Sequence, residues 1–95
     1  MKVFISQPMM NKPNDILQKE RAEVVKQLEA EGYTVLDSLF SLPEGQDSPL
    51  EYLAESIKLM AHADGVVFMQ GWDMSRGCVM EYEIAMRYSK FVKIL

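Results

Sequence analysis

The sequence contains one cysteine and one histidine, Cys78 and His62, among its 95 residues. A lone cysteine excludes an intrachain disulfide and a cysteine-based metal cluster, and it suits a reducing compartment. A lone histidine argues against a multi-histidine metal site and against a Ser-His-Asp triad. We therefore expect no bound metal ion, a core-filling role for Cys78 and a surface position for His62.

Long apolar runs, strong charge and glycine-rich motifs are also lacking. No apolar run approaches membrane-spanning length, and the N-terminal strand pattern at residues 1–5 ends too soon for a signal peptide. A formal net charge of −4 argues against polymeric nucleic acid and membrane surfaces as partners. Neither GxGxxG nor a P-loop lysine motif is present, so we expect no cofactor. We predict a cytoplasmic protein.

Short apolar stretches alternate with helical patterns along the chain. The predicted strands cover residues 3–5, 33–36, 65–69 and 91–95. The predicted helices begin at an Asn14 N-cap, at a Ser48 capping box and near Gly77. Gly32 is expected to end the first helix.

Alternating strands and helices predict a parallel sheet with right-handed crossovers. We expect one α/β domain over residues 1–95, with a three-layer flavodoxin-like or Rossmann-like fold. The four parallel strands should have the order 2-1-3-4. That order places the carboxyl ends of the first and third strands together at the switch point, where open α/β sheets bind ligands.

The segment from residue 37 to residue 48 is irregular but carries three apolar side chains: Leu39, Phe40 and Leu42. Such a segment can close over a pocket as a lid, or it can pack against the sheet edge. The pattern leaves both alternatives open.

Glu81 is out of place in the third predicted helix. At 100° per residue its neighbours on the same arc are mostly apolar: Cys78, Ile84, Ala85 and Tyr88. Glu83 and Arg87 lie on the other side with the spacing of a solvated ion pair. A carboxylate on an apolar arc must be paired, neutral or functional. Glu81 is therefore either a functional carboxylate or a structural one bound to a backbone amide or to Arg76.

Polar residues cluster in the two loops that meet at the switch point. They are Ser6, Gln7 and Asn11 after the first strand, and Trp72, Asp73, Ser75 and Gly77 after the third. Together with the amides of a helix N-terminus, these side chains are expected to bind a phosphate or a sugar. Structural alternatives are packing of Trp72 over the sheet end and helix capping by Asp73 or Ser75. Asp64 is assigned a structural position at the start of its strand.

Three stretches carry a resemblance to a known family: FISQP at residues 4–8, DGVV at residues 64–67, and S-x-G-x-x-x-E-x-x-x-A at residues 75–85. In this order and spacing, which span nearly the whole chain, the sequence resembles the nucleoside 2-deoxyribosyltransferase-like superfamily. That group includes the deoxynucleoside 5′-monophosphate N-glycosidases.

The resemblance implies that Glu81 is the nucleophile that attacks C1′ of a nucleoside or of its 5′-monophosphate. A covalent glycosyl-enzyme then forms and the base is released, by the logic of a retaining glycosidase. Ser75 and Gly77, with Ser6 and Gln7, would hold the sugar or its phosphate. The resemblance also implies a homodimer or a larger homo-oligomer.

Two positions depart from the family pattern. Phe4 stands near the place of a tyrosine, and Ser56 stands where an aspartate protonates the leaving base. Glu55 is rotated by about 100° from Ser56 on the helix and is expected to face elsewhere. The alternative function is therefore a non-catalytic module that binds a nucleotide or phosphosugar without the general acid.

Overall fold

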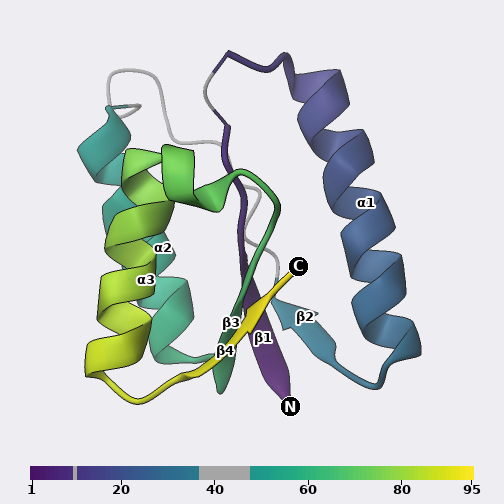
Figure 1. Cartoon of the computed structure of the whole chain (residues 1–95), viewed down its shortest axis with the longest axis vertical. Helices are drawn as coiled ribbons and strands as arrows, with labels where there is room; N and C mark the ends of the chain where they lie inside the picture. Colours follow the sequence, from purple (N-terminus) through teal and green to yellow (C-terminus); the bar gives the residue numbers. More distant parts are fainter. Residues whose placement is uncertain (10, 37–47) are drawn as a thin grey trace.

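The computed structural model describes residues 1–9, 11–36 and 48–95 of the chain. The strands are β1 (Lys2–Ser6), β2 (Thr34–Leu36), β3 (Gly65–Phe68) and β4 (Phe91–Ile94). The helices are α1 (Asn14–Ala30), α2 (Pro49–Ala61) and α3 (Arg76–Arg87), with a 3-10 turn, η1 (Trp72–Met74), before α3. Strands and helices alternate as the sequence predicts (Figure 1).

The four strands form one parallel sheet in the order β2-β1-β3-β4. Helix α1 lies on one side of the sheet, and α2 and α3 lie together on the other (Figure 1). The predicted three-layer α/β fold and its strand order are therefore confirmed.

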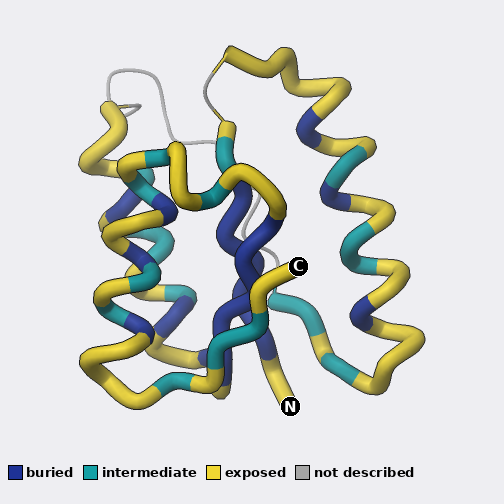
Figure 2. The backbone as a smooth tube through the Cα atoms, in the orientation of Figure 1, coloured by how far each residue is buried: buried dark blue, intermediate teal, exposed yellow. Residues whose placement is uncertain are grey.

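The two central strands are the most buried part of the chain (Figure 2). Successive side chains of a strand point to opposite faces, so each central strand contributes to both layers of the core. The layer facing α1 is built on Val3, Ile5, Leu28, Val67 and Met69. The layer facing α2 and α3 is built on Phe4, Met60, Ala63, Val66, Phe68 and Ala85. Ser6 has the same parity as Phe4 and therefore faces α2 and α3.

The helix ends agree with the sequence in part. The Glu51 amide donates to Ser48 Oγ over 3.2 Å, which confirms Ser48 as the cap of α2. Gly32 follows α1 with a φ of +94°, a conformation that glycine adopts without strain. The prediction of Asn14 as an N-cap is wrong. Pro13 holds the extended cap position and Asn14 is already helical, because a proline before the first turn provides the required φ.

Asp64 has the expected structural place at the amino end of the sheet, where its Oδ2 accepts a bond of 2.8 Å from the Lys2 amide. His62 is exposed, as predicted, and it forms the C-terminal cap of α2. No helix within the described ranges is long and apolar enough to span a membrane. Leu39, Phe40 and Leu42 lie outside the described residues, so the lid and edge-packing alternatives stay predictions.

Candidate functional site

Glu81 is buried in α3 with 6% of its surface exposed, and it is hydrogen-bonded to the end of β1. Ser6 Oγ donates to Glu81 Oε1 over 2.7 Å. The same strand end is bonded to the chain after β3, since the Met69 amide donates to the Ser6 carbonyl over 3.0 Å. The switch point therefore brings Ser6 and Glu81 together, as the strand order predicts. The alternative partner Arg76 is exposed.

The apolar arc around Glu81 is only partly as predicted. Cys78 and Ala85 are buried beside it, and Ile84 is half-buried. Tyr88 is 76% exposed, so its predicted place on this arc is wrong. The reason is that α3 ends at Arg87 and Tyr88 is already the C-terminal cap, where the regular rotation of 100° per residue stops.

Burial raises the pKa of Glu81 above its ordinary value, because desolvation penalises the charged carboxylate. Hydrogen bonds from the Ser6 hydroxyl and, less strongly, from the Ser56 hydroxyl of α2 act in the opposite direction. Burial also raises the pKa of the Cys78 thiol, opposed by hydrogen bonds with Ser6 and Ser75. The thiol is therefore protonated at neutral pH, where it is a poor nucleophile.

The N-terminus of α3 forms the second part of the site. Ser75 caps the helix, since its Oγ accepts a bond of 3.5 Å from the Cys78 amide. Asp73 is exposed in η1 and does not form the cap. Gly77 lies in the first turn, where a Cβ would meet no atom within 4 Å. The helix end therefore combines partial positive charge with open space, as anion binding requires.

The two predicted ligand residues that follow Ser6, Gln7 and Asn11, do not join this cluster. Gln7 is 7% exposed, and its Nε2 donates to the Leu17 carbonyl of α1 over 2.9 Å. It follows Ser6 in a strand that alternates faces, so it lies on the α1 side of the sheet, away from Glu81. Asn11 is exposed with a φ of 64°, which indicates a role in the turn before α1.

Trp72 packs over the end of the sheet, which is the structural alternative that the sequence left open. Its ring stacks on Tyr82 with centroids 4.8 Å apart and lies 5.2 Å from the ring of Phe68. The half-buried Trp72 thus packs over the end of β3 and against α3. The partner Tyr82 is missed by sequence reasoning, although it lies next to Glu81 in the helix.

The profile of a family described as "Domain of unknown function (DUF4406)" matches residues 1–94. The chain belongs to this family. No curated protein matches it significantly. The family description states no activity, so any function of the DUF4406 chain has to be argued from its own site.

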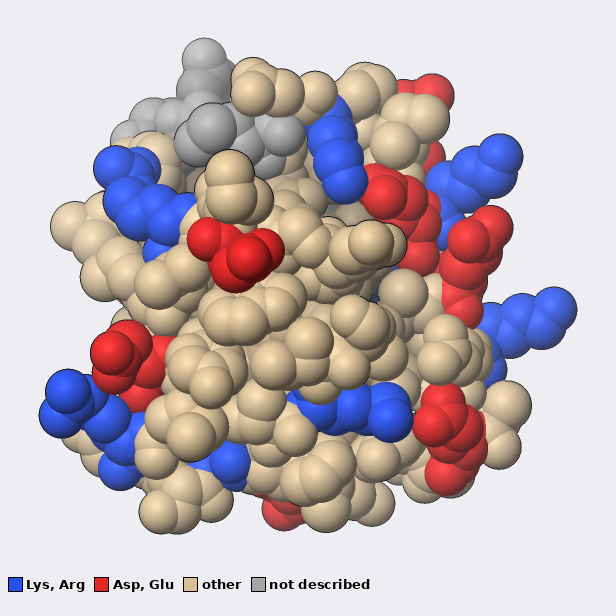
Figure 3. All heavy atoms as spheres, in the orientation of Figure 1, with Lys and Arg blue, Asp and Glu red and all other residues tan. Residues whose placement is uncertain are grey.

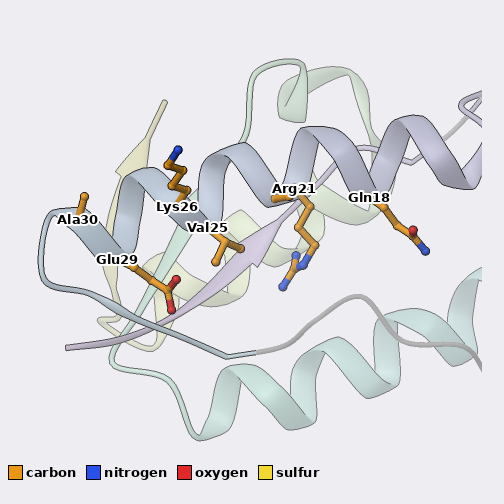
Figure 4. Close-up of a pocket in the computed structure, with 7 residues that line it drawn as sticks. Gln18, Arg21, Val25, Lys26, Glu29 and Ala30 are labelled. Atoms are coloured by element: carbon orange, nitrogen blue, oxygen red, sulfur yellow. The ribbon is translucent and has the colours of Figure 1, made fainter.

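The DUF4406 chain also has an open groove of about 710 Å³ along α1 (Figure 4). Its described lining consists of Gln18, Arg21, Ala22, Val25, Lys26, Glu29 and Ala30. The buried Arg21, which donates from Nη2 to the Leu36 carbonyl over 3.3 Å, is missed by sequence reasoning. Its spacing of four residues from Leu17 and seven from Leu28 would have placed it on the buried stripe.

This groove lies across the sheet from Glu81, and its described lining comes from one helix. At Glu81, in contrast, side chains from β1, α2 and α3 meet at a single carboxylate. We therefore take the Glu81 cluster as the candidate functional site. In the described part of the chain, no group of three or more His, Cys, Asp or Glu residues is arranged to hold a metal ion.

Proposed function

We propose that this protein processes nucleosides or nucleotides at C1′ of the sugar, as an N-glycosidase or a deoxyribosyltransferase with Glu81 as the nucleophile. The substrate would be a (deoxy)nucleoside or its 5′-monophosphate. The bond of 2.7 Å between Ser6 and Glu81 carries the proposal. It holds a buried carboxylate in a defined orientation at the carboxyl edge of the sheet, beside the N-terminus of α3.

The proposed reaction has two steps. The Glu81 carboxylate attacks C1′, the C1′–N bond breaks, and the base leaves with the electron pair and takes up a proton from solvent water. The enzyme is then an ester of the sugar at Glu81. Water attacks C1′ in the second step and gives up a proton to the solvent, the ester bond breaks, and the carboxylate is restored. If a second base attacks instead of water, the outcome is deoxyribosyl transfer.

The groups around Glu81 suit this role. Removal of water makes a carboxylate more basic, and the hydrogen bond from Ser6 fixes the orientation of the Glu81 carboxylate through Oε1. The open space at Gly77 and the partial positive charge at the N-terminus of α3 support binding of a 5′-phosphate or a sugar hydroxyl nearby. The buried Cys78 thiol is hydrogen-bonded with Ser6 and Ser75, and because burial raises its pKa it stays protonated and does not compete as a nucleophile.

Base release is the direct test. The purified protein is incubated with each deoxynucleoside and each 5′-monophosphate, and free base is measured by chromatography. We expect release by the wild type and none by Glu81→Gln, which preserves shape and the acceptor for Ser6. Glu83→Gln, two residues away on the exposed side of α3, serves as the matched control. Equal release by Glu81→Gln, or no release by the wild type, would contradict the proposal.

The second candidate is a non-catalytic module that binds a nucleotide or a phosphosugar at the same site. One observation favours it: the group that reaches Glu81 from α2 is the Ser56 hydroxyl, which cannot protonate a leaving base as a carboxylic acid does. The neighbouring Glu55 instead pairs with Lys58 over 3.0 Å on the surface. A thermal-shift screen with nucleosides, nucleotides and phosphosugars tests this function. Stabilisation without base release is expected for a binding module, and stabilisation by no compound contradicts it.

A further inference from the structure

Helices α2 and α3 lie side by side and run in the same direction. Each begins at the carboxyl edge of the sheet and returns to the start of the next strand (Figure 1). Residues that follow one another at intervals of four and three lie on one face of a helix. The two helices share such a set of intervals, with Tyr52, Ser56 and Leu59 in α2 and Gly77, Glu81 and Ile84 in α3. The two sets therefore form three levels along the helix pair.

The middle and lower levels are filled by side chains of both helices. At the middle level the Ser56 hydroxyl is hydrogen-bonded to the Glu81 carboxylate, so these two faces are turned toward each other. One turn further from the carboxyl edge, Leu59 and Ile84 are half-buried and pack against the same core layer. Apolar side chains therefore close the space below Glu81.

The upper level consists of Tyr52 and Gly77. Four residues correspond to about 6 Å along a helix, so this level lies one turn from Glu81 toward the carboxyl edge. Tyr52 is half-buried, and at Gly77 a Cβ would meet no atom within 4 Å. An aromatic ring on one helix is thus matched with an open glycine on the other, and the missing side chain leaves room next to the ring.

The chemistry at Glu81 decides which part of a nucleotide reaches this room. A nucleophile attacks C1′ from the face opposite to the leaving group. The base therefore lies on the side of C1′ that is turned away from the carboxylate. Because Leu59 and Ile84 close the lower level, the base is directed toward the carboxyl edge, to the level of Tyr52 and Gly77.

We infer that the base stacks on the ring of Tyr52, in the room that Gly77 leaves between α2 and α3. This inference rests on the proposed function, since it takes C1′ to lie at Glu81. Every base has a π face, so an aromatic ring accepts purines and pyrimidines alike. The phosphate is carried at the other end of the sugar, so it can lie at the N-terminus of α3 while the base lies against α2.

Stacking of an uncharged base also suits the surface around α3. Uncharged side chains fill most of the middle of the face that carries this helix, and charged ones lie mainly toward its margins (Figure 3). A contact through an aromatic ring needs no charged side chain.

Binding measured without turnover tests the inference. Glu81→Gln serves as the background, so that calorimetry gives the dissociation constant of each intact deoxynucleoside 5′-monophosphate. The matched ligand is 2-deoxyribose 5-phosphate, which has no base. Adding Tyr52→Ala should raise the dissociation constant of every 5′-monophosphate about ten-fold, as expected for the loss of one stacked base. Binding of 2-deoxyribose 5-phosphate should not change. Tyr52→Phe, which keeps the ring, should restore the binding of the 5′-monophosphates.

Two further variants control for the fold. Tyr88→Ala removes an exposed tyrosine at the other end of α3 and should have no effect on binding. Gly77→Leu fills the same room from α3, at a position with open space. It should weaken the binding of the 5′-monophosphates more than that of 2-deoxyribose 5-phosphate, and it keeps the inference testable if Tyr52→Ala does not fold. Circular dichroism shows which variants are folded.

Four results would overturn the inference. They are unchanged binding by Tyr52→Ala, an equal loss for 2-deoxyribose 5-phosphate, a loss in Tyr52→Phe as large as in Tyr52→Ala, and no binding of any 5′-monophosphate. Base release is measured separately, so the two proposals fail separately. Release with binding that does not depend on Tyr52 retains the proposed function and overturns the inference. Binding that depends on Tyr52, without release, does the opposite.

Discussion

The hydroxyl of Ser6 donates a hydrogen bond of 2.7 Å to the carboxylate of Glu81, although the two residues are 75 positions apart in the chain. Both side chains are buried, so the bond is formed away from bulk solvent. A hydrogen bond to a charged group contributes about 1.5–3 kcal/mol, more than a bond between neutral groups. This single contact couples the end of the first strand to the last helix, and it opposes the rise in the pKa of Glu81 that burial causes.

The buried carboxylate should cost stability at neutral pH. The pKa of Glu81 is raised in the folded state. The contribution of Glu81 to stability is therefore present below the ordinary carboxyl pKa, and it is lost as the pH rises through the raised pKa of the folded protein. We predict that Glu81→Gln stabilises the fold at neutral pH, with a difference that shrinks in acid. A change of about 1 kcal/mol moves the melting temperature of a domain this size by roughly 4–8 °C.

Urea unfolding of wild type and Glu81→Gln at a series of pH values measures this difference. Glu83→Gln is the control, since Glu83 is exposed and pairs with Arg87 on the surface. If the difference in unfolding free energy between wild type and Glu81→Gln is the same at acidic and neutral pH, the prediction that Glu81 is buried as a charged carboxylate is contradicted.

Ser6→Ala should raise the pKa of Glu81 further, because it removes the stronger of the two hydroxyl hydrogen bonds that lower it. The folded protein should be destabilised by about 1.5–3 kcal/mol at neutral pH, where the carboxylate is left without this bond. Ser56→Ala should act in the same direction with a smaller effect. Chemical denaturation compares the two variants, and a larger effect from Ser56→Ala would reverse the ranking.

Base release should depend on pH through Glu81. A nucleophile has to be ionised, so activity should fall as the pH drops through the raised pKa of this carboxyl. Ser6→Ala should move this acid limb to higher pH. The pH profile of kcat/KM reports the pKa in the free enzyme, and a limb that does not move in Ser6→Ala would exclude Glu81 as its source.

Ser56→Asp tests whether the chain lacks only a proton donor. Ser56 already reaches Glu81 from α2, so an aspartate there would share one site with the carboxylate. When two carboxyl groups lie close together, their pKa values separate, and the group with the higher pKa stays protonated and can act as an acid. We expect base release to increase at least ten-fold, since a positioned acid contributes roughly 10²–10⁴-fold. Unchanged release with intact ligand binding would favour the non-catalytic module.

Two glycines should respond to alanine in opposite ways. At Gly65 a Cβ would lie 2.8 Å from the Phe91 carbonyl oxygen, so Gly65→Ala should separate β3 from β4 and destabilise the fold by about 1–3 kcal/mol. At Gly77 the space is open and the residue is helical, so Gly77→Ala should stabilise by about 0.5–1 kcal/mol. Thermal unfolding measures both, and a destabilised Gly77→Ala would show that the first turn of α3 is more crowded than described.

Much of the fold follows from local patterns. The strand and helix order, the Ser48 cap, the Gly32 stop and the Glu83–Arg87 pair all depend on residues a few positions apart. Periodicity and capping chemistry act over that range, so a single sequence is enough to predict them. The strand order follows from right-handed crossovers and from the need to cover both faces of a parallel sheet. The unusual place of Glu81 on an apolar arc was visible for the same reason.

Other features were decided by the tertiary structure. Gln7 and Ser6 are adjacent in the sequence, yet they face opposite sides of the sheet, and only the packing of α1 shows which side belongs to Gln7. Trp72 lies in the predicted ligand loop but stacks on Tyr82, which depends on where α3 crosses the sheet.

The sequence by itself therefore determined the α/β architecture and identified Glu81 as the residue to explain. Tertiary structure decided the partners of that carboxylate, because Ser6, Ser56 and Glu81 belong to three different elements. Distances between elements depend on how their side chains fill the space between them. That packing is a property of the whole core, and no local pattern in the chain specifies it.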